Sequence, residues 1–431
     1  MIPKTIDPDQ KRSPNDFTRE NKLPFPKLIT FILSITCSDK NNGVDIKAGE
    51  FFKTAKRSGL WPGAEAIHRS TLTKARKKVS WEIFETLFHK TVKLAYECFP
   101  QKTDYLWHGK SVFAIDGSKY TLPATKEIRE TYDLKSGLEF RGKGHFPQCL
   151  VNTAYDVFRR LPVARTVVGN NDSERDEVKK MIPHIPQGSV LMFDRGYPSW
   201  ELIYHLNRHF NGLYLFRCPA SNSFNAVKGF IDSDEADDTV WFEPSGRFVR
   251  SLSKSERNEL QPIKLRLVRL EAPDGSLSVL LTNLFDEVEF STVEIIDLYF
   301  RRWEVETYYR DEKVLLEIER FHSKTDNGIR QELFASLIMA IISRILMVWS
   351  TPDSSTNEPQ FKNAIRNLAS EAFALTPEDP RKAVEIFADI LRDIQRVKYY
   401  RPKVPRPTQP RVTKKTVKKW SVLKGQKLAN A

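Results

Sequence analysis

SVFAIDGSKYTLP, residues 111–123, predicts a short buried strand followed by a turn, and this stretch decides the fold. SVLMFDRGY, residues 189–197, repeats the pattern: four apolar residues precede an acid and a turn that contains glycine. Asp116 and Asp194 therefore each follow a predicted buried strand. Because functional sites in α/β proteins gather at strand ends, the two aspartates are candidate site residues. Each alone is equally consistent with an aspartate that begins a turn.

The sequence on either side of these stretches alternates between strand and helix patterns. Ser173 is the expected N-cap of the first helix. Strands are predicted at 148–158, 162–169 and 212–218, and helices at 173–185 and 200–210. This order predicts an α/β fold class, a mixed sheet in a domain of three layers.

Residues 219–290 break this pattern and predict a β-rich insertion within the α/β domain. The strands expected at 263–270 and 276–284 form a hairpin. Along the first of them, apolar residues alternate with Lys264 and Arg266, so one face should be buried and the other basic.

Helical periodicity dominates both ends of the chain. Residues 71–99 predict one amphipathic helix, in which the basic run 74–78 faces either solvent or DNA, with a solvated face favoured. The apolar run 333–349 predicts a buried helix, since it is short for a membrane span. The predicted domains are a helical N-terminal region (1–108), a catalytic domain (109–218 and 291–350) around the insertion (219–290), C-terminal helices (351–395) and a basic disordered tail (396–431).

Charge and cysteine content narrow the class of protein. The chain has 431 residues and a net charge of +13, and twelve Lys and Arg residues without any Asp or Glu lie within 396–431. The rest of the chain therefore carries only +1, and the tail is either a salt-dependent DNA contact or a solubilising segment. The four cysteines form no CxxC pair, so neither a disulfide framework nor a zinc site is expected. The polar N-terminus predicts no signal peptide and a cytoplasmic protein.

The segment YFRRWEVETYYRDEK, residues 299–313, places four polar residues on one face of a helix. They are Tyr299, Arg302, Glu306 and Lys313, at spacings of three, four and seven. From the residues alone, an exposed face with ion pairs such as Arg302 to Glu306 is the favoured interpretation.

The same four residues resemble the Tyr-Arg-Glu-Lys signature of the insertion-sequence-4 family of bacterial DDE transposases. The surroundings of Asp116 and Asp194 are similar to those of that family's two catalytic aspartates, and the resemblance extends from about residue 70 to 324. It implies a ribonuclease-H-like catalytic domain interrupted by a β-rich insertion. It also implies that Asp116, Asp194 and Glu306 are the catalytic triad and metal ligands.

Further expectations follow from this resemblance. Three hard oxygen donors suit Mg²⁺ or Mn²⁺, and two ions per active site about 4 Å apart can clamp the attacking and leaving oxygens of phosphoryl transfer. The expected DNA-binding residues are Tyr299, Arg302 and Lys313, with Arg195 and Arg217 in a weaker phosphate role. For Trp303 and Trp241 a core position is favoured over stacking on a flipped base.

The function implied is that of a bacterial insertion-sequence transposase, which cuts at the element's ends and joins the 3′-hydroxyl to target DNA. Expected partners are double-stranded DNA, both inverted-repeat ends and target, and a second copy of the chain in a homodimeric synaptic complex. No membrane partner is expected, and the predicted location is the bacterial nucleoid. Two alternatives stay open: a ribonuclease-H-like nuclease without strand transfer, and a DNA-binding relic that no longer cuts.

Overall fold

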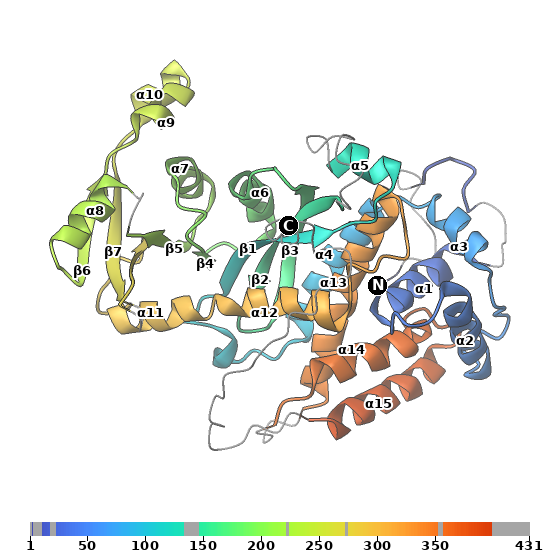
Figure 1. The fold of residues 1–431 in the computed structure, drawn as a ribbon. Coiled ribbons are helices and arrows are strands. Elements are labelled where there is room, and N and C mark those ends of the chain that lie inside the picture. Colours follow the sequence, from blue (N-terminus) through green and yellow to red (C-terminus); the bar gives the residue numbers. More distant parts are fainter. Residues whose placement is uncertain are drawn as a thin grey trace, which may run out of the picture.

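One mixed sheet of eight strands runs through the middle of the molecule (Figure 1). The computed structural model describes residues 2, 11–17, 23–132, 146–220, 224–271, 275–351 and 357–398. The strand order is β3-β2-β1-β4-β5-β8-β7-β6. The strands are β1 (Val112–Thr121), β2 (Gln148–Asp156), β3 (Leu161–Gly169), β4 (Val190–Phe193), β5 (Leu213–Pro219), β6 (Asp237–Phe242), β7 (Ile263–Glu271) and β8 (Leu277–Thr282).

The first five strands form the part of the sheet that the sequence predicted. β1 pairs antiparallel with β2 and β2 with β3, whereas β1, β4 and β5 run parallel to one another. Short helices connect the parallel strands: α6 (Glu174–Met181) leads into β4 and α7 (Trp200–His209) leads into β5. The predicted α/β class is confirmed, and this strand order agrees with the expected ribonuclease-H-like fold.

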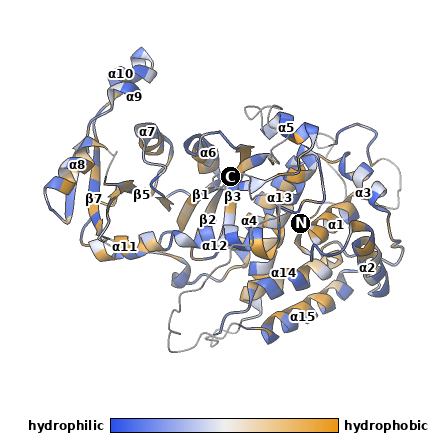
Figure 2. Ribbon diagram, viewed as in Figure 1, coloured by the Kyte–Doolittle hydropathy of each residue, from blue (hydrophilic) through white to orange (hydrophobic). Residues whose placement is uncertain are grey.

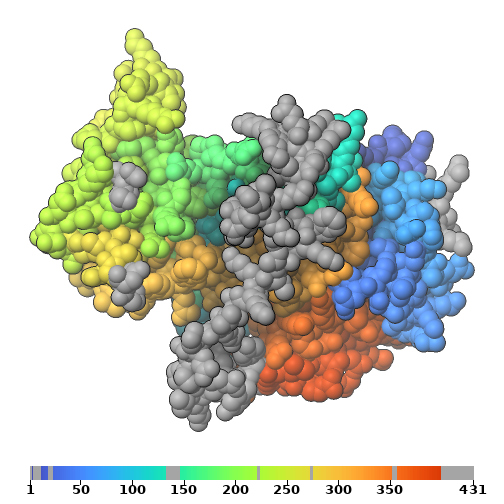
Figure 3. All heavy atoms as spheres, viewed as in Figure 1, coloured from blue at the N-terminus to red at the C-terminus, as the bar shows by residue number. Residues whose placement is uncertain are grey.

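The segment expected as an insertion adds three strands to the same sheet. β8 pairs antiparallel with β5, and β7 then pairs with β8 and β6 with β7. The helices of this segment are α8 (Asn225–Asp232), α9 (Gly246–Ser251) and α10 (Lys254–Glu259). The last two form a tip that projects from the body (Figures 1 and 3). The boundaries predicted for a separate subdomain stay a prediction.

The basic face expected on β7 is wrong for one of its two residues. Arg266 is 1% exposed, and its guanidinium donates to both carboxylate oxygens of Asp237 and to the carbonyls of Leu284 and Phe290. Five hydrogen-bond donors in a fixed plane allow a buried arginine to be fully satisfied in this way. The alternation of apolar and charged residues along β7 therefore predicted a solvent-facing charge at a position where the structure has a buried ion pair.

Helices from both ends of the chain pack together around α13 (Asp326–Trp349). Its most apolar window is 83% buried, so the predicted buried helix at 333–349 is confirmed, although α13 is apolar and long enough to cross a membrane. Figure 2 shows hydrophobic residues along α13 and α1. The surrounding helices are α1 (Phe25–Cys37), α2 (Val44–Arg57), α3 (Arg69–Arg76), α4 (Glu82–Cys98), α14 (Phe361–Ser370) and α15 (Pro380–Arg396), and α5 (Lys126–Tyr132) follows β1.

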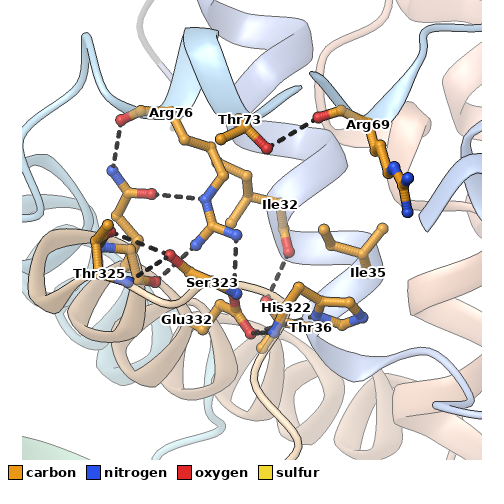
Figure 4. Close-up of polar contacts among 12 residues, drawn as sticks. Ile32, Ile35, Thr36, Arg69, Thr73, Arg76, His322, Ser323, Thr325 and Glu332 are labelled. Atoms are coloured by element: carbon orange, nitrogen blue, oxygen red, sulfur yellow. Dashed lines mark hydrogen bonds and ion pairs between the residues drawn. The ribbon is translucent and has the colours of Figure 1, made fainter. Parts of the chain in front are cut away.

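The single helix predicted at 71–99 is interrupted. α3 ends at Arg76 and α4 begins at Glu82. Arg76 is 6% exposed, and its guanidinium donates to the side chains of Gln331 and Glu332 on α13 (Figure 4). The favoured solvated face is therefore wrong for the central residue of the basic run, which ties the N-terminal helices to α13 instead.

The helix predicted at 299–313 is also divided. α11 (Thr292–Phe300) and α12 (Trp303–Arg310) follow one another along one face of the sheet, and α12 continues into a π-helical turn (Asp311–Leu315) (Figure 1). A capping box between Ser291 and Glu294 fixes the start of α11. The predicted helix face therefore begins in α11 and ends in the π-turn.

Candidate active site

Strand register places Asp116 and Asp194 side by side. β1 and β4 are parallel, and their last matched residues are Ile115 and Phe193. Asp116 is the next residue of β1, which continues to Thr121, so the turn expected directly after Asp116 is wrong, whereas Asp194 directly follows the end of β4. Because paired strands lie about 4.8 Å apart, the two backbones present their carboxylates at one edge of the sheet.

Arg302 joins Asp194 to Glu306. The Arg302 Nη2 atom lies 2.8 Å from Glu306 Oε1 and 4.0 Å from Asp194 Oδ1. Its guanidinium is 2% exposed, and its Nε and Nη1 atoms have no hydrogen-bond partner among the described residues. An arginine buried in this way keeps two donors available for an anion at the site.

Asp116 is partly buried within the site. Burial raises the pKa of its carboxyl to about 7; the charge of Arg302 opposes the rise, and the charges of Glu306 and Glu174 add to it. The raised pKa therefore reflects chiefly the burial of this carboxyl, with the neighbouring acids adding to it. Tyr309 donates to the carbonyls of Asp116 and Val151 and so fixes the strand backbone here.

Tyr299 and Lys313 border the acids from either end of the helical segment. The Tyr299 hydroxyl lies 3.4 Å from Asp194 Oδ1, and burial raises the pKa of this phenol. Lys313 Nζ donates to Ser118 Oγ and to the Lys119 carbonyl, each at 2.7 Å. Lys313 therefore lies over β1, two residues beyond Asp116, and the structure brings together all four signature positions with both aspartates.

A buried ion pair anchors the π-turn that carries Lys313. Arg165 on β3 and Glu312 in the π-turn are 0% exposed at their side chains, and Arg165 donates to both carboxylate oxygens of Glu312. The hydroxyls of Tyr308 and Ser336 also donate to Glu312. This network fixes Glu312 inside the domain, so the adjacent Lys313 is directed to β1.

Arg195 and Arg217 lie on the side of the site next to the three added strands. Arg195 lines a groove of about 870 Å³ together with Arg175 and Trp241. Arg217 Nε donates to Ser278 Oγ, and the charge of Arg217 also acts on the phenol of Tyr299. Arg195 therefore borders the groove directly after Asp194 in the chain, and Arg217 lies close enough to Tyr299 for its charge to act there.

The core position favoured for the two tryptophans is wrong. Trp303 is 54% exposed and Trp241 is 63% exposed. The guanidinium of Arg302 lies 5.5 Å from the ring centre of Trp303, so one face of that indole adjoins the site. The local sequence does not distinguish an exposed tryptophan beside a functional site from a tryptophan in the core, because both have apolar and aromatic neighbours in sequence.

Several residues at the site were missed from the sequence. The charge of Glu174 acts on Asp116, and Arg175 donates from Nε and Nη2 to the Gly196 carbonyl. The hydroxyl of Tyr197 lies near Asp116 and Glu174, whose charges add to the rise in its pKa that burial causes. Glu174 and Arg175 lie in the first turn of α6, where acids are common for reasons of helix stability, so their sequence carries no separate signal.

The oxygen donors of the triad fit a hard divalent cation. In this structure the guanidinium of Arg302 balances part of the negative charge of the triad. Asp116, Asp194 and Glu306 offer only carboxylate oxygens, which Mg²⁺ and Mn²⁺ prefer. In this conformation no three acidic, histidine or cysteine side chains of the described residues converge closely enough to hold one ion. The guanidinium of Arg302 is the positive group between Asp194 and Glu306.

Acids on two adjacent strands beside a buried guanidinium suit an enzyme that acts on phosphate groups, as nucleases and transposases do. A family model described as "Transposase DDE domain" matches residues 107–342, which is more than half of the chain. The chain therefore belongs to the transposase DDE domain family, and the resemblance to insertion-sequence-4 transposases predicted from the signature is confirmed.

The chain is also similar to individual transposases. The chain is 23% identical over 340 residues to "Transposase InsG for insertion sequence element IS4" of Escherichia coli (strain K12), covering 76% of this chain and 73% of that protein. It resembles a chain in a cryo-EM structure of the piggyBac transposase synaptic complex with hairpin DNA, with 12% identity and a TM-score of 0.44. That likeness covers 88% of this chain and 77% of the other, and it is too distant to bear on function.

Proposed function

We propose that this chain is a metal-dependent DNA transposase of a bacterial insertion sequence. It cuts at the element's ends and joins the freed 3′-hydroxyl to target DNA by phosphoryl transfer. The observation that carries the proposal is Arg302, a buried guanidinium beside Asp194 and Glu306 that keeps two donor nitrogens without a partner among the described residues. This combination suits a phosphate held next to acidic metal ligands.

The metal site in this proposal consists of Asp116, Asp194 and Glu306, with Mg²⁺ or Mn²⁺ at two ions per active site. The ions, when bound, supply charge neutralisation and Lewis-acid activation of the scissile phosphate. The raised pKa of Asp116 supports this assignment, because carboxylates in a buried, acid-rich site need added positive charge to ionise together. Arg302 orients Glu306 through its 2.8 Å contact.

The remaining site residues position DNA in this proposal. Arg302 and Lys313 bind backbone phosphates, Tyr299 orders the Asp194 carboxylate, and Arg195 and Arg217 extend the cationic side. Charge-assisted hydrogen bonds of this kind are strong and carry no sequence information. They therefore hold the scissile strand in place, and recognition of a particular end sequence belongs to other parts of the protein.

The assembly proposed is a homodimer that pairs two inverted-repeat ends before it engages target DNA at the bacterial nucleoid. Residues 1–108 are proposed to contact the ends, and this region packs on α13 through α1 and α4. Most of the basic tail, from residue 399 onward, lies outside the described residues. Its role is proposed from charge alone, as a salt-dependent contact with DNA.

The variant Glu306→Gln tests this proposal because it removes one charge and keeps the side-chain volume. Nicking of a duplex that carries the element's ends should fall about a thousandfold or more, while DNA affinity stays within about threefold. Glu304→Gln is the matched control, since Glu304 lies on the same helix and its contact with Arg160 is a 3.7 Å ion pair at the surface. Undiminished nicking by Glu306→Gln would show that the triad is assigned wrongly.

A further inference from the structure

Glu174 places a carboxylate directly over the residue that follows Asp116. A Cβ atom added to Gly117 would lie 2.8 Å from Glu174 Cδ and 2.9 Å from Glu174 Oε1. Ser173 caps α6 through the backbone N–H of Asp176, so Glu174 is not needed as the cap. The Glu174 side chain instead reaches from the first turn of α6 to β1.

A second oxygen converges on the same point from β2. Asn152 pairs with Gly117 across the β1–β2 ladder, and its Oδ1 atom would lie 2.9 Å from the same added Cβ. The Asn152 Nδ2 atom donates to Thr166 Oγ1 at 3.1 Å. Asn152 is 0% exposed, and its Oδ1 atom has no hydrogen-bond partner among the described residues. A buried amide oxygen without a donor calls for a ligand that accepts its lone pairs.

The charge distribution identifies the kind of ligand. The carboxylates of Glu174 and Glu306 both lie close enough to Asp116 for their charges to act on it. Arg302, the cation beside these acids, forms its ion pair with Glu306 at 2.8 Å. Carboxylate oxygens together with a neutral amide oxygen form a donor set that suits a hard divalent cation.

We propose that Glu174 is a fourth acidic residue of the metal site and that its carboxylate, with the Asn152 amide oxygen, holds a divalent cation beside Gly117. This inference rests on the proposed function, because it assigns a further ligand to the same site. It explains why glycine follows Asp116: any larger residue at 117 would displace both oxygens. It also gives a role to a buried asparagine oxygen that is otherwise unsatisfied.

Binding of Mn²⁺ alone tests the inference without any catalytic readout. The full-length protein is titrated with Mn²⁺, and free Mn²⁺ is followed by electron paramagnetic resonance. Glu174→Gln keeps the side-chain volume over Gly117 and should raise the dissociation constant by about tenfold or more. Asp176→Asn is the control on the same helix turn; it removes a surface ion pair to Lys179 and should bind as the wild type does. Circular dichroism melting verifies that both variants fold.

Two further variants separate this inference from the proposed function. Asp116→Asn and Glu306→Gln should both weaken Mn²⁺ binding if the triad holds metal. If they do so while Glu174→Gln binds like the wild type, the role of Glu174 is overturned and the triad stands. If the wild type binds no Mn²⁺ at millimolar concentration, both assignments are overturned.

Discussion

Arg302 and Glu306 form a 2.8 Å ion pair one helical turn apart, with the guanidinium buried and the carboxylate about one-third exposed at 36%. A pair on a solvated helix face contributes little and leaves both groups in water. Here the arginine is enclosed between α12 and the acidic strand end, and two of its nitrogens have no partner in the described part of the chain. The favoured sequence interpretation, an exposed ion pair, therefore holds for the contact but is wrong for the burial.

Replacing Arg302 by glutamine should lower nicking about a hundredfold, because the variant loses the charge-assisted donors that hold a phosphate. Arg301→Gln is the matched control, since Arg301 is the exposed neighbour whose guanidinium lies over the ring of Phe158. Single-turnover nicking of an end duplex measures the effect. Equal rates for the two variants would contradict a phosphate role for Arg302.

Substituting Gly117 by alanine should weaken Mn²⁺ binding by displacing the Glu174 carboxylate. The added methyl group would lie 2.8 Å from Glu174 Cδ, closer than packed atoms allow, so the flexible carboxylate must move. In a Glu174→Gln background the same substitution should have a much smaller effect on Mn²⁺ affinity. Such non-additivity in a double-mutant cycle shows that the two positions act through one contact. Additive effects would separate Gly117 from Glu174.

Arg76→Met should lower the free energy of unfolding by about 3–5 kcal/mol, because it leaves the Glu332 carboxylate buried without its ion-pair partner. The Arg76 and Glu332 side chains are 7% and 0% exposed and lie 2.8 Å apart. Lys74→Met, at an exposed position of the same helix, is the control. Urea denaturation followed by circular dichroism gives both values, and a loss below about 1 kcal/mol for Arg76→Met would contradict a buried pair.

The ion pair between Arg76 and Glu332 also makes the free energy of unfolding depend on pH. Burial by itself raises the pKa of Glu332, but Arg76 and the hydrogen bond from His322 outweigh burial and hold this pKa well below its ordinary value. A depressed pKa contributes stability above the unfolded-state value of about 4.3, and this contribution is lost as pH falls below it. Between pH 6 and pH 3.5 the wild type should therefore lose more unfolding free energy than an Arg76→Met/Glu332→Gln double variant. Parallel losses in both proteins would contradict this linkage.

Most strands of the sheet were predictable because a buried strand leaves a short apolar run in the sequence. Asp116 and Asp194 share that signal, and register then makes them neighbours. Residues whose partners are far away in sequence gave no such signal. Arg76 and Arg266 both belong to charged or alternating patterns, yet each is buried by a carboxylate that the sequence alone cannot pair with it.

The candidate site was only partly predictable for the same reason. The four signature positions lie within one segment of fifteen residues, 299–313, so their spacing alone places them on one face of a helix. Glu174 and Asn152 meet Gly117 only after β2 and α6 have folded against β1, and neither has an unusual neighbour in sequence. The core positions predicted for Trp303 and Trp241 were wrong for a different reason. The exposure of a tryptophan depends on which other elements pack against its helix or strand, and the hydrophobicity of the local sequence does not show this.

The most direct test of the central claim is a cleavage and joining assay on a labelled duplex that carries the element's own ends, with Mg²⁺, Mn²⁺ or EDTA. We predict nicking at the transposon end that requires metal, stops in EDTA, and is followed by a product in which the 3′-hydroxyl is joined to target DNA. Metal-dependent cutting of any duplex without joining would instead identify a general nuclease. End binding without any nicking in Mg²⁺ or Mn²⁺ would contradict the proposed catalytic function.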